Sequence, residues 1–142
     1  MTADDITIST GKSSLTLDEL GRTLPGTARL MAEVGPRIGG SWHAAQAGNW
    51  DLTRYLFRSG LKVLRTVPIV RPKYAASMAT FIDEDCRPVL AAIEEGDLEA
   101  FNAAFDAMVE AANRYHVEFD KAFIVWRIPT DPPPDLVLEP RG

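Results

Sequence analysis

The chain has 142 residues, of which 46% are hydrophobic, and its formal net charge is −5 with an isoelectric point near 5.0. This length favours one compact domain, and this hydrophobic content can build a core without disulfides or metal ions. The acidic balance argues against nucleic acid or an anionic membrane as the main partner, because both require clustered Lys and Arg.

Cysteine content and the N-terminal residues indicate a cytoplasmic protein. Cys86 is the single cysteine, which excludes an internal disulfide and favours a reducing compartment. The first residues, MTADDITISTGKSS, carry acidic side chains where a signal peptide needs positive charge. No stretch approaches the roughly 20 apolar residues of a membrane span, so we expect no membrane partner.

The N-terminal part of the chain is polar and is followed by a strong helical pattern. We expect residues 1–16 to form a loose arm, with a short helical turn at 17–20. A first long helix is predicted over about 25–47, with Gly48 as its stop. An apolar stripe at alternating spacings of four and three should face the core: Leu24, Ala28, Met31, Gly35, Ile38, Trp42 and Ala45.

Residues 50–67 form the second predicted helix, with Asn49 as its cap and Pro68 at its end. Tyr55 belongs to its apolar residues, and we place this side chain in the core with its hydroxyl at the edge. Tyr74, at the start of the third helix, receives the same interpretation.

The third helix is predicted from about residue 71 to Gly96, and Pro88 in its middle should kink or split it near Cys86. Asp97 is a good cap for the fourth helix. That helix has the clearest apolar spacing of the chain: Leu98, Phe101, Phe105, Met108, Ala112, Tyr115 and Phe119.

The C-terminal part of the chain cannot continue this helical pattern. The apolar segment FIVWRIP, residues 123–129, should lie extended across the helices, and the tail 130–142 is rich in proline. Four amphipathic helices with short connections predict an all-α protein, an antiparallel four-helix bundle over residues 17–129 with an extended Pro-rich tail.

Three segments carry the sequence patterns of one known family. AAQAGNWDLTRY (44–55) is similar to its AG-x-AGNW-x-LA-x-Y junction between the first two helices. SMATFIDEDCRPVLAAIEEGD (77–97) is similar to its pattern before the last helix. Residues 101–129 resemble its CNACH motif followed by FIVI-x-x-P. Over about residues 25–130, the chain resembles the bacterial four-helix-bundle proteins related to cytochrome c-prime.

In the haem-bearing members of that family, two cysteines bind haem and the next histidine ligates its iron. The corresponding positions here are Ala112, Tyr115 and His116, and Asn113 is retained. Without thiols no covalent haem can form, so the resemblance implies a haem-less relative. Ala112 and Tyr115 lie on the core-facing stripe, and the lost haem would leave a large chamber. A ligand fills this chamber, or aromatic rings do: Tyr115, Trp42 and Trp126.

A second unusual feature is EVGPRIGGSWH, residues 33–43, which puts three glycines and a proline inside the first helix. Each interior Gly costs about 1 kcal/mol relative to Ala, and an interior Pro about 3. A kink, or a late helix start with Pro36 in the first turn, would explain this segment. Alternatively, the glycines clear space for a ligand and let backbone groups approach it.

Few residues carry candidate chemistry. His116 is a hydrogen-bonded histidine at the edge of the pocket, an axial ligand of a non-covalent haem, or an acid/base. Asp85 is a boundary residue that reaches solvent, or a buried carboxylate that serves as a general base. His43 near a helix C-terminus suits the helix dipole. Cys86 should be a small core hydrophobe, and no spacing predicts a metal site.

These observations predict that the protein binds a small apolar or aromatic molecule in the former haem chamber, without a bound cofactor. The alternatives are a small cofactor-independent enzyme that uses His116 or Asp85, and non-covalent b-type haem binding through His116. The resemblance also implies a possible homodimer. The residues expected to line the chamber are Arg37, Trp42, His43, Tyr55, Tyr74, Met78, Met108, Ala112, Tyr115 and His116.

Overall fold

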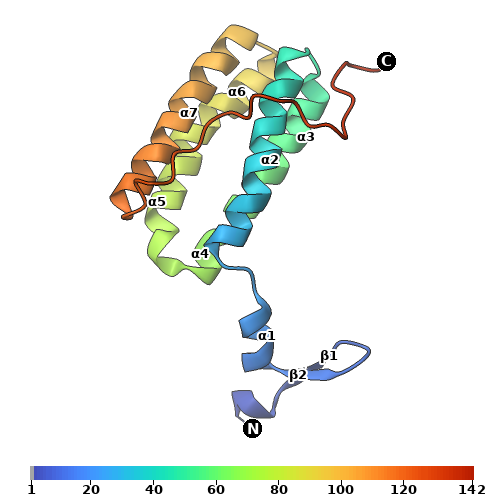
Figure 1. The fold of residues 1–142 in the computed structure, drawn as a ribbon, viewed down its shortest axis with the longest axis vertical. Coiled ribbons are helices and arrows are strands. Elements are labelled where there is room, and N and C mark those ends of the chain that lie inside the picture. Colours follow the sequence, from blue (N-terminus) through green and yellow to red (C-terminus); the bar gives the residue numbers. More distant parts are fainter. Residues whose placement is uncertain (1) are drawn as a thin grey trace.

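The computed structural model describes residues 2–142, except for the side chain of Asp4, and these residues are mostly helical (Figure 1). The prediction of an all-α protein is therefore confirmed in its main part. One short antiparallel pair of strands, which the sequence pattern did not indicate, lies near the N-terminus.

The N-terminal segment projects away from the other helices as a separate arm (Figure 1). After the 3₁₀ turn η1 (Ala3–Asp5), strands β1 (Thr7–Ser9) and β2 (Ser14–Thr16) pair with Ile8 opposite Leu15. Helix α1 (Leu17–Thr23) follows, and its first turn is closed by a capping box between Thr16 and Glu19. The arm is thus locally ordered, and it continues to residue 23 rather than ending at 16.

Helices α2 (Thr27–Gln46) and α3 (Trp50–Leu64) lie side by side and are joined by a short turn (Figure 1). Gly48 takes a positive φ of 74° in this turn. The side chain of Asn49 caps α3 by accepting a hydrogen bond from the Leu52 amide. Gly48 and Asn49 therefore end one helix and cap the next, as the sequence predicts.

The buried faces of α2 and α3 follow the predicted apolar residues only in part. In α2, Ile38 and Ala45 of the predicted stripe are buried, whereas Leu24 lies outside the helix and is 55% exposed. In α3 the buried side chains include Phe57 and Leu61, and Tyr55 is 69% exposed, so its prediction as a core residue was wrong. The reason is that neighbouring positions differ by about 100° around a helix, so a stripe displaced by one or two residues points elsewhere.

The predicted third helix is interrupted, as its proline suggested. Helix α4 (Val67–Val70) and the 3₁₀ turn η2 (Pro72–Tyr74) lead into α5 (Ala75–Thr80), the π-helical turn η3 (Phe81–Cys86) and α6 (Arg87–Glu95). Pro88 has no amide hydrogen to donate to the carbonyl four residues earlier, and the wider π turn ends just before it. Gly96 then ends α6 with a left-handed φ of 64°.

Helix α7 (Leu98–Glu118) begins at Asp97, whose carboxylate accepts a hydrogen bond from the Ala100 amide. It packs on α6 and η3, while α2 packs on α3. Phe57, Phe101 and Phe105 are fully buried at the centre of the core. These two packed pairs leave a seam between α2 and α7, which touch each other at few points.

A C-terminal strap, residues 119–142, runs without helix across this seam and ends beyond α2 and α3 (Figure 1). The predictions of an extended FIVWRIP segment and of a non-helical Pro-rich tail are confirmed. Trp126 and Ile128 of the strap pack against the core, whereas Phe123 and Val125 point into solvent.

Candidate functional site

Polar side chains of the helices hold the strap over the seam between α2 and α7. The Asn113 side chain on α7 accepts a hydrogen bond from the Trp126 amide (2.8 Å) and donates one to the Trp126 carbonyl (2.9 Å). His116 Nδ1 lies 2.9 Å from the Ile124 carbonyl oxygen, and His43 Nε2 lies 2.7 Å from that of Pro129. Both histidines and Asn113 therefore fix the strap.

The geometry of these contacts assigns the tautomer of each neutral histidine. A carbonyl oxygen can only accept, so Nδ1 of His116 and Nε2 of His43 must donate. The lone pair of neutral His116 therefore lies on Nε2, and that of neutral His43 on Nδ1. His116 is oriented by a backbone carbonyl, as metal-ligating histidines commonly are.

The glycines of α2 make room for the strap. A Cβ atom on Gly39 would lie 2.7 Å from Pro129 Cδ, closer than van der Waals contact permits, and one on Gly40 would lie 3.3 Å from Pro133 Cγ. A Cβ on Gly35 would lie 3.4 Å from Trp126 Nε1. Space is cleared along this helix, and the chain's own C-terminal segment occupies it. Pro36 lies inside one continuous helix, so a late helix start is wrong.

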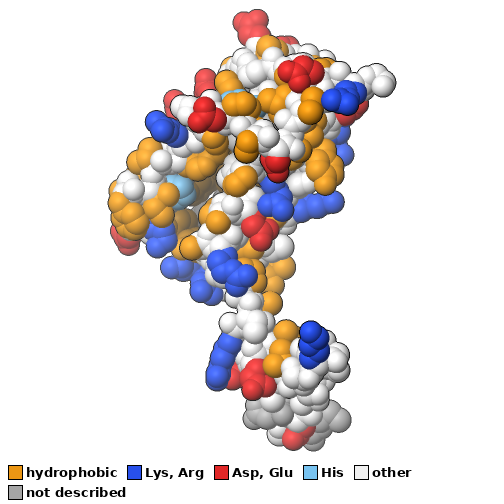
Figure 2. Space-filling view, turned by 45° about the vertical axis from the view of Figure 1, so that its right-hand side comes forward, with side chains coloured by type: hydrophobic (Ala, Val, Ile, Leu, Met, Phe, Trp, Pro, Cys, Tyr) orange, Lys and Arg blue, Asp and Glu red, His pale blue; other side chains and the backbone are white. Residues whose placement is uncertain are grey.

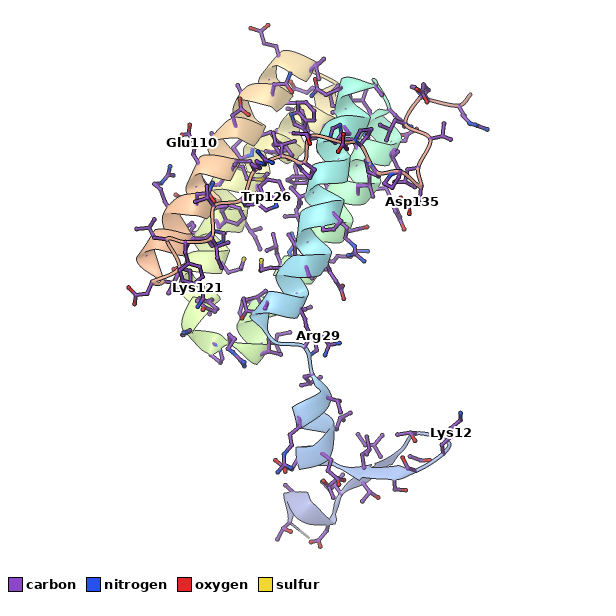
Figure 3. The ribbon with its side chains drawn as sticks, viewed as in Figure 1. Lys12, Arg29, Glu110, Lys121, Trp126 and Asp135 are labelled. Carbon is purple, nitrogen blue, oxygen red and sulfur yellow. The ribbon has the colours of Figure 1, made fainter. Side chains whose placement is uncertain are left out.

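Aromatic rings pack around the end of α7 that the resemblance associates with haem. Tyr115 is half-buried and meets the ring of Phe81 edge-on, with 6.0 Å between centroids. Tyr74 meets Phe119 in the same way at 4.8 Å. Partial burial raises the pKa of Tyr115, and the nearby carboxylate of Asp85 adds to this effect. Trp126 lies between α7 and α2 (Figure 3).

The remaining residues expected in the chamber are dispersed. Met108 is part of the buried core, and Met78 and Trp42 are half-buried against it. Ala112 is half-buried on α7. The ten predicted lining residues therefore do not surround one common space.

Two of them, Arg37 and Tyr55, do meet in a cleft. This Arg37 cleft has a volume of about 510 Å³ and lies between α2, α3 and the strap. The Arg37 guanidinium is held on its own helix by the Glu33 carbonyl oxygen, at 2.7 Å. Asp135 marks the strap side of the cleft, beyond α2 and α3 (Figure 3). The full lining is Pro36, Arg37, Tyr55, Leu56, Ser59, Lys62, Val63, Pro133, Asp135 and Leu136.

A second cleft, of about 370 Å³, lies at the start of α2. Tyr74 is the one predicted residue that lines it. The other lining residues come from the first turn of α2, from the loop before α5 and from the strap: Gly26, Thr27, Ala28, Arg71, Lys73 and Lys121.

The candidate acid/base Asp85 lies half-buried on η3. Loss of solvent raises the pKa of its carboxyl group, while the positive charge of Arg114 opposes this and Glu84 reinforces it. Cys86, the next residue, is fully buried, and burial raises the pKa of its thiol to about 12. The prediction of Cys86 as a core residue is confirmed. No group of His, Cys, Asp and Glu in the described part of the chain has the arrangement of a metal site.

The strap's part in the clefts does not follow from the sequence patterns. The sequence predicts only that the tail with Pro133 and Leu136 is not helical, and Lys62 and Lys121 lie on no motif. The available signal was the pairing of a glycine-rich helix face with an apolar, proline-rich segment far away in sequence, because close backbone approach requires small residues.

Within residues 2–142, no helix combines the length and apolar character needed to cross a membrane. Comparison of the chain with protein-family models, with curated proteins and with solved structures finds no significant match.

Proposed function

We propose that this protein binds a small, largely apolar or aromatic molecule with an acidic group in the Arg37 cleft. The proposal rests on one observation: Arg37 on α2 and Tyr55 on the neighbouring α3 line the same cleft of about 510 Å³. Small-molecule sites are commonly concave spaces of roughly 300–1,000 Å³ with apolar walls and a few polar groups.

The chemistry of the lining supports this ligand class. Leu56, Val63 and Leu136 offer apolar contact, and the exposed ring of Tyr55 offers a large face at low entropic cost. Lys62 supplies positive charge for an acidic group, and the planar guanidinium of Arg37, which lies 3.7 Å from the Glu33 carboxylate, suits a second carboxylate. Asp135 on the opposite wall disfavours a ligand with several negative charges.

Native mass spectrometry of the freshly purified chain tests the proposal. We expect a co-purifying small molecule whose occupancy falls at least tenfold in the Tyr55→Ala/Arg37→Gln double variant. Arg58→Gln is the matched control, because Arg58 lies on α3, pairs with Glu94 and does not line the cleft. A molecule bound equally by all three proteins would contradict the proposed site, and an apo mass for the wild-type chain would contradict the function.

Non-covalent haem binding through His116 is the second candidate, and the orientation of this side chain favours it. Nδ1 donates to the Ile124 carbonyl, which leaves the Nε2 lone pair as a ligand for iron. Haemin titration should then give a Soret shift that His116→Ala abolishes and His43→Ala retains. An unshifted Soret band would exclude this candidate.

We also propose that α2, α3, the α5–α6 segment and α7 form an antiparallel four-helix bundle of the cytochrome c-prime-like type. Long helices, short connections and a common apolar core support this assignment. The homodimer, the cytoplasmic location and the absence of a resident cofactor stay predictions.

A further inference from the structure

The second cleft carries a concentration of positive charge, although the protein as a whole is acidic. Lys and Arg side chains gather at the end of the helical body nearest the N-terminal arm (Figure 2). Arg71, Lys73 and Lys121 line one cleft of about 370 Å³, although the whole chain has a net charge of −5. Lys121 lies at the strap end just beyond α7 (Figure 3).

None of these three cations forms an ion pair with a carboxylate whose side chain the structure describes. Arg71 instead donates to the neighbouring Val70 carbonyl, and the ammonium of Lys73 lies over the Tyr74 ring, 5.0 Å from its centroid. Three cations around one cleft repel one another, so their arrangement favours an anion between them.

The start of α2 adds to this positive potential. Gly26 is the N-cap of this 20-residue helix and provides no capping side chain, so the first amides keep their partial positive charge. The Arg71 guanidinium lies against this end, since a Cβ on Gly26 would be 3.6 Å from its Nη2. The hydroxyl oxygen of Thr27, in the first turn, is shielded from solvent and has no hydrogen-bond partner among the described residues.

From the three cations and the start of α2, which has no capping side chain, we infer that the second cleft binds the phosphate group of a phosphate monoester. Arg offers a planar fork and Lys a mobile point charge, a combination suited to phosphate oxygens. The cleft is larger than a phosphate group alone, so it leaves room for an attached organic part beside Tyr74. This site is separate from the Arg37 cleft, with which it shares no lining residue.

The test is a titration of the full chain at low ionic strength, followed by NMR shifts of the backbone amides of residues 26–28. Phenyl phosphate is the soluble probe, and vesicles containing phosphatidic acid are the lipid probe in a sedimentation assay. Saturable binding of phenyl phosphate identifies a soluble phosphate monoester as the ligand class, whereas binding of the vesicles alone identifies a lipid headgroup.

Two matched double variants separate the site from general electrostatics. Lys73→Gln/Lys121→Gln should weaken binding at least tenfold, whereas Lys12→Gln/Arg58→Gln removes the same charge outside both clefts and should change it less than twofold. Unchanged thermal unfolding would verify that both variants fold. Absence of saturable binding of either probe, or equal weakening in both variants, would overturn the inference.

Discussion

Single glycines decide how closely the strap approaches α2. Gly39 and Gly40 face Pro129 and Pro133, and any side chain at Gly39 would overlap the Pro129 ring. The sequence marks these positions as costly for a helix but does not reveal their partner. The partner lies about 90 residues later in the chain, and only the folded structure brings the two segments together.

Gly39→Ala should destabilise the protein, whereas Gly21→Ala in α1 should not. Overpacking costs about 1–3 kcal/mol, which exceeds the gain of roughly 1 kcal/mol in helix propensity. At Gly21 a new Cβ meets nothing within 4 Å, so the propensity gain dominates. Urea unfolding of the two variants measures the difference, and equal stability would mean that the strap moves aside at little cost.

Burial of the Cys86 thiol has a pH-dependent consequence for stability. The thiol pKa rises from 9.0 to about 12 in the folded chain, so its contribution is fully present below pH 9. Above pH 9 the unfolded chain releases a proton that the folded chain retains, and this contribution falls as pH rises. The stability difference between wild type and Cys86→Ala should therefore shrink between pH 8 and pH 10.5 in chemical denaturation. A constant difference would contradict this.

At the scale of elements, the strap closes the seam that two separately packed helix pairs leave open. Its contacts are of two kinds: apolar packing by Trp126 and Ile128, and hydrogen bonds from Asn113, His116 and His43. It also supplies one wall of the Arg37 cleft through Pro133 and Leu136. The position of the strap therefore sets the shape of the proposed ligand site.

Asn113→Ala should loosen the strap without unfolding the helices. The substitution removes both hydrogen bonds to Trp126 and leaves half-buried backbone groups unpaired, at a cost of about 1–3 kcal/mol. Hydrogen exchange in residues 120–133 should accelerate, while exchange in α3 should not change. Asn102→Ala, which removes a single side-chain hydrogen bond to Gln46, is the control. Equal exchange in both variants would argue that apolar packing alone holds the strap.

At the scale of the whole molecule, the arm and the helical body are two nearly independent parts. The arm's hairpin and α1 contact each other, and Ile6, Ile8 and Leu17 stay largely exposed. An isolated two-stranded hairpin is marginally stable in water. The hydrophobic core lies entirely within the body, whose helices begin at α2.

Deletion of residues 2–24 should leave the melting temperature of the body nearly unchanged, because the arm buries little surface against it. Differential scanning calorimetry of the full and shortened chains at several concentrations measures this. A clear decrease that depends on concentration would show that the arm instead joins two copies of the chain.

Much of the helical layout followed from local chemistry. The sequence predicts Asn49 and Asp97 as caps because their side chains accept hydrogen bonds from free amides at a helix start. It predicts Gly48 and Gly96 as stops because glycine adopts the positive φ that ends a helix. The interruption before Pro88 followed from its missing amide hydrogen. The hairpin was not foreseen, since three-residue strands carry too few residues to show an alternating pattern.

The candidate site depended on the tertiary structure instead. The spacing of the apolar residues predicts Tyr55 in the core, but a displacement of one position around α3 turns it into the cleft beside Arg37. The sequence marks His43, Asn113 and His116 as candidates, yet it does not predict their shared contacts with the strap. By itself, the sequence determined where helices begin and end, because caps, glycines and prolines act within a few residues. Only the tertiary structure decided which faces are buried and what fills the space above the glycines, because those depend on contacts between distant segments.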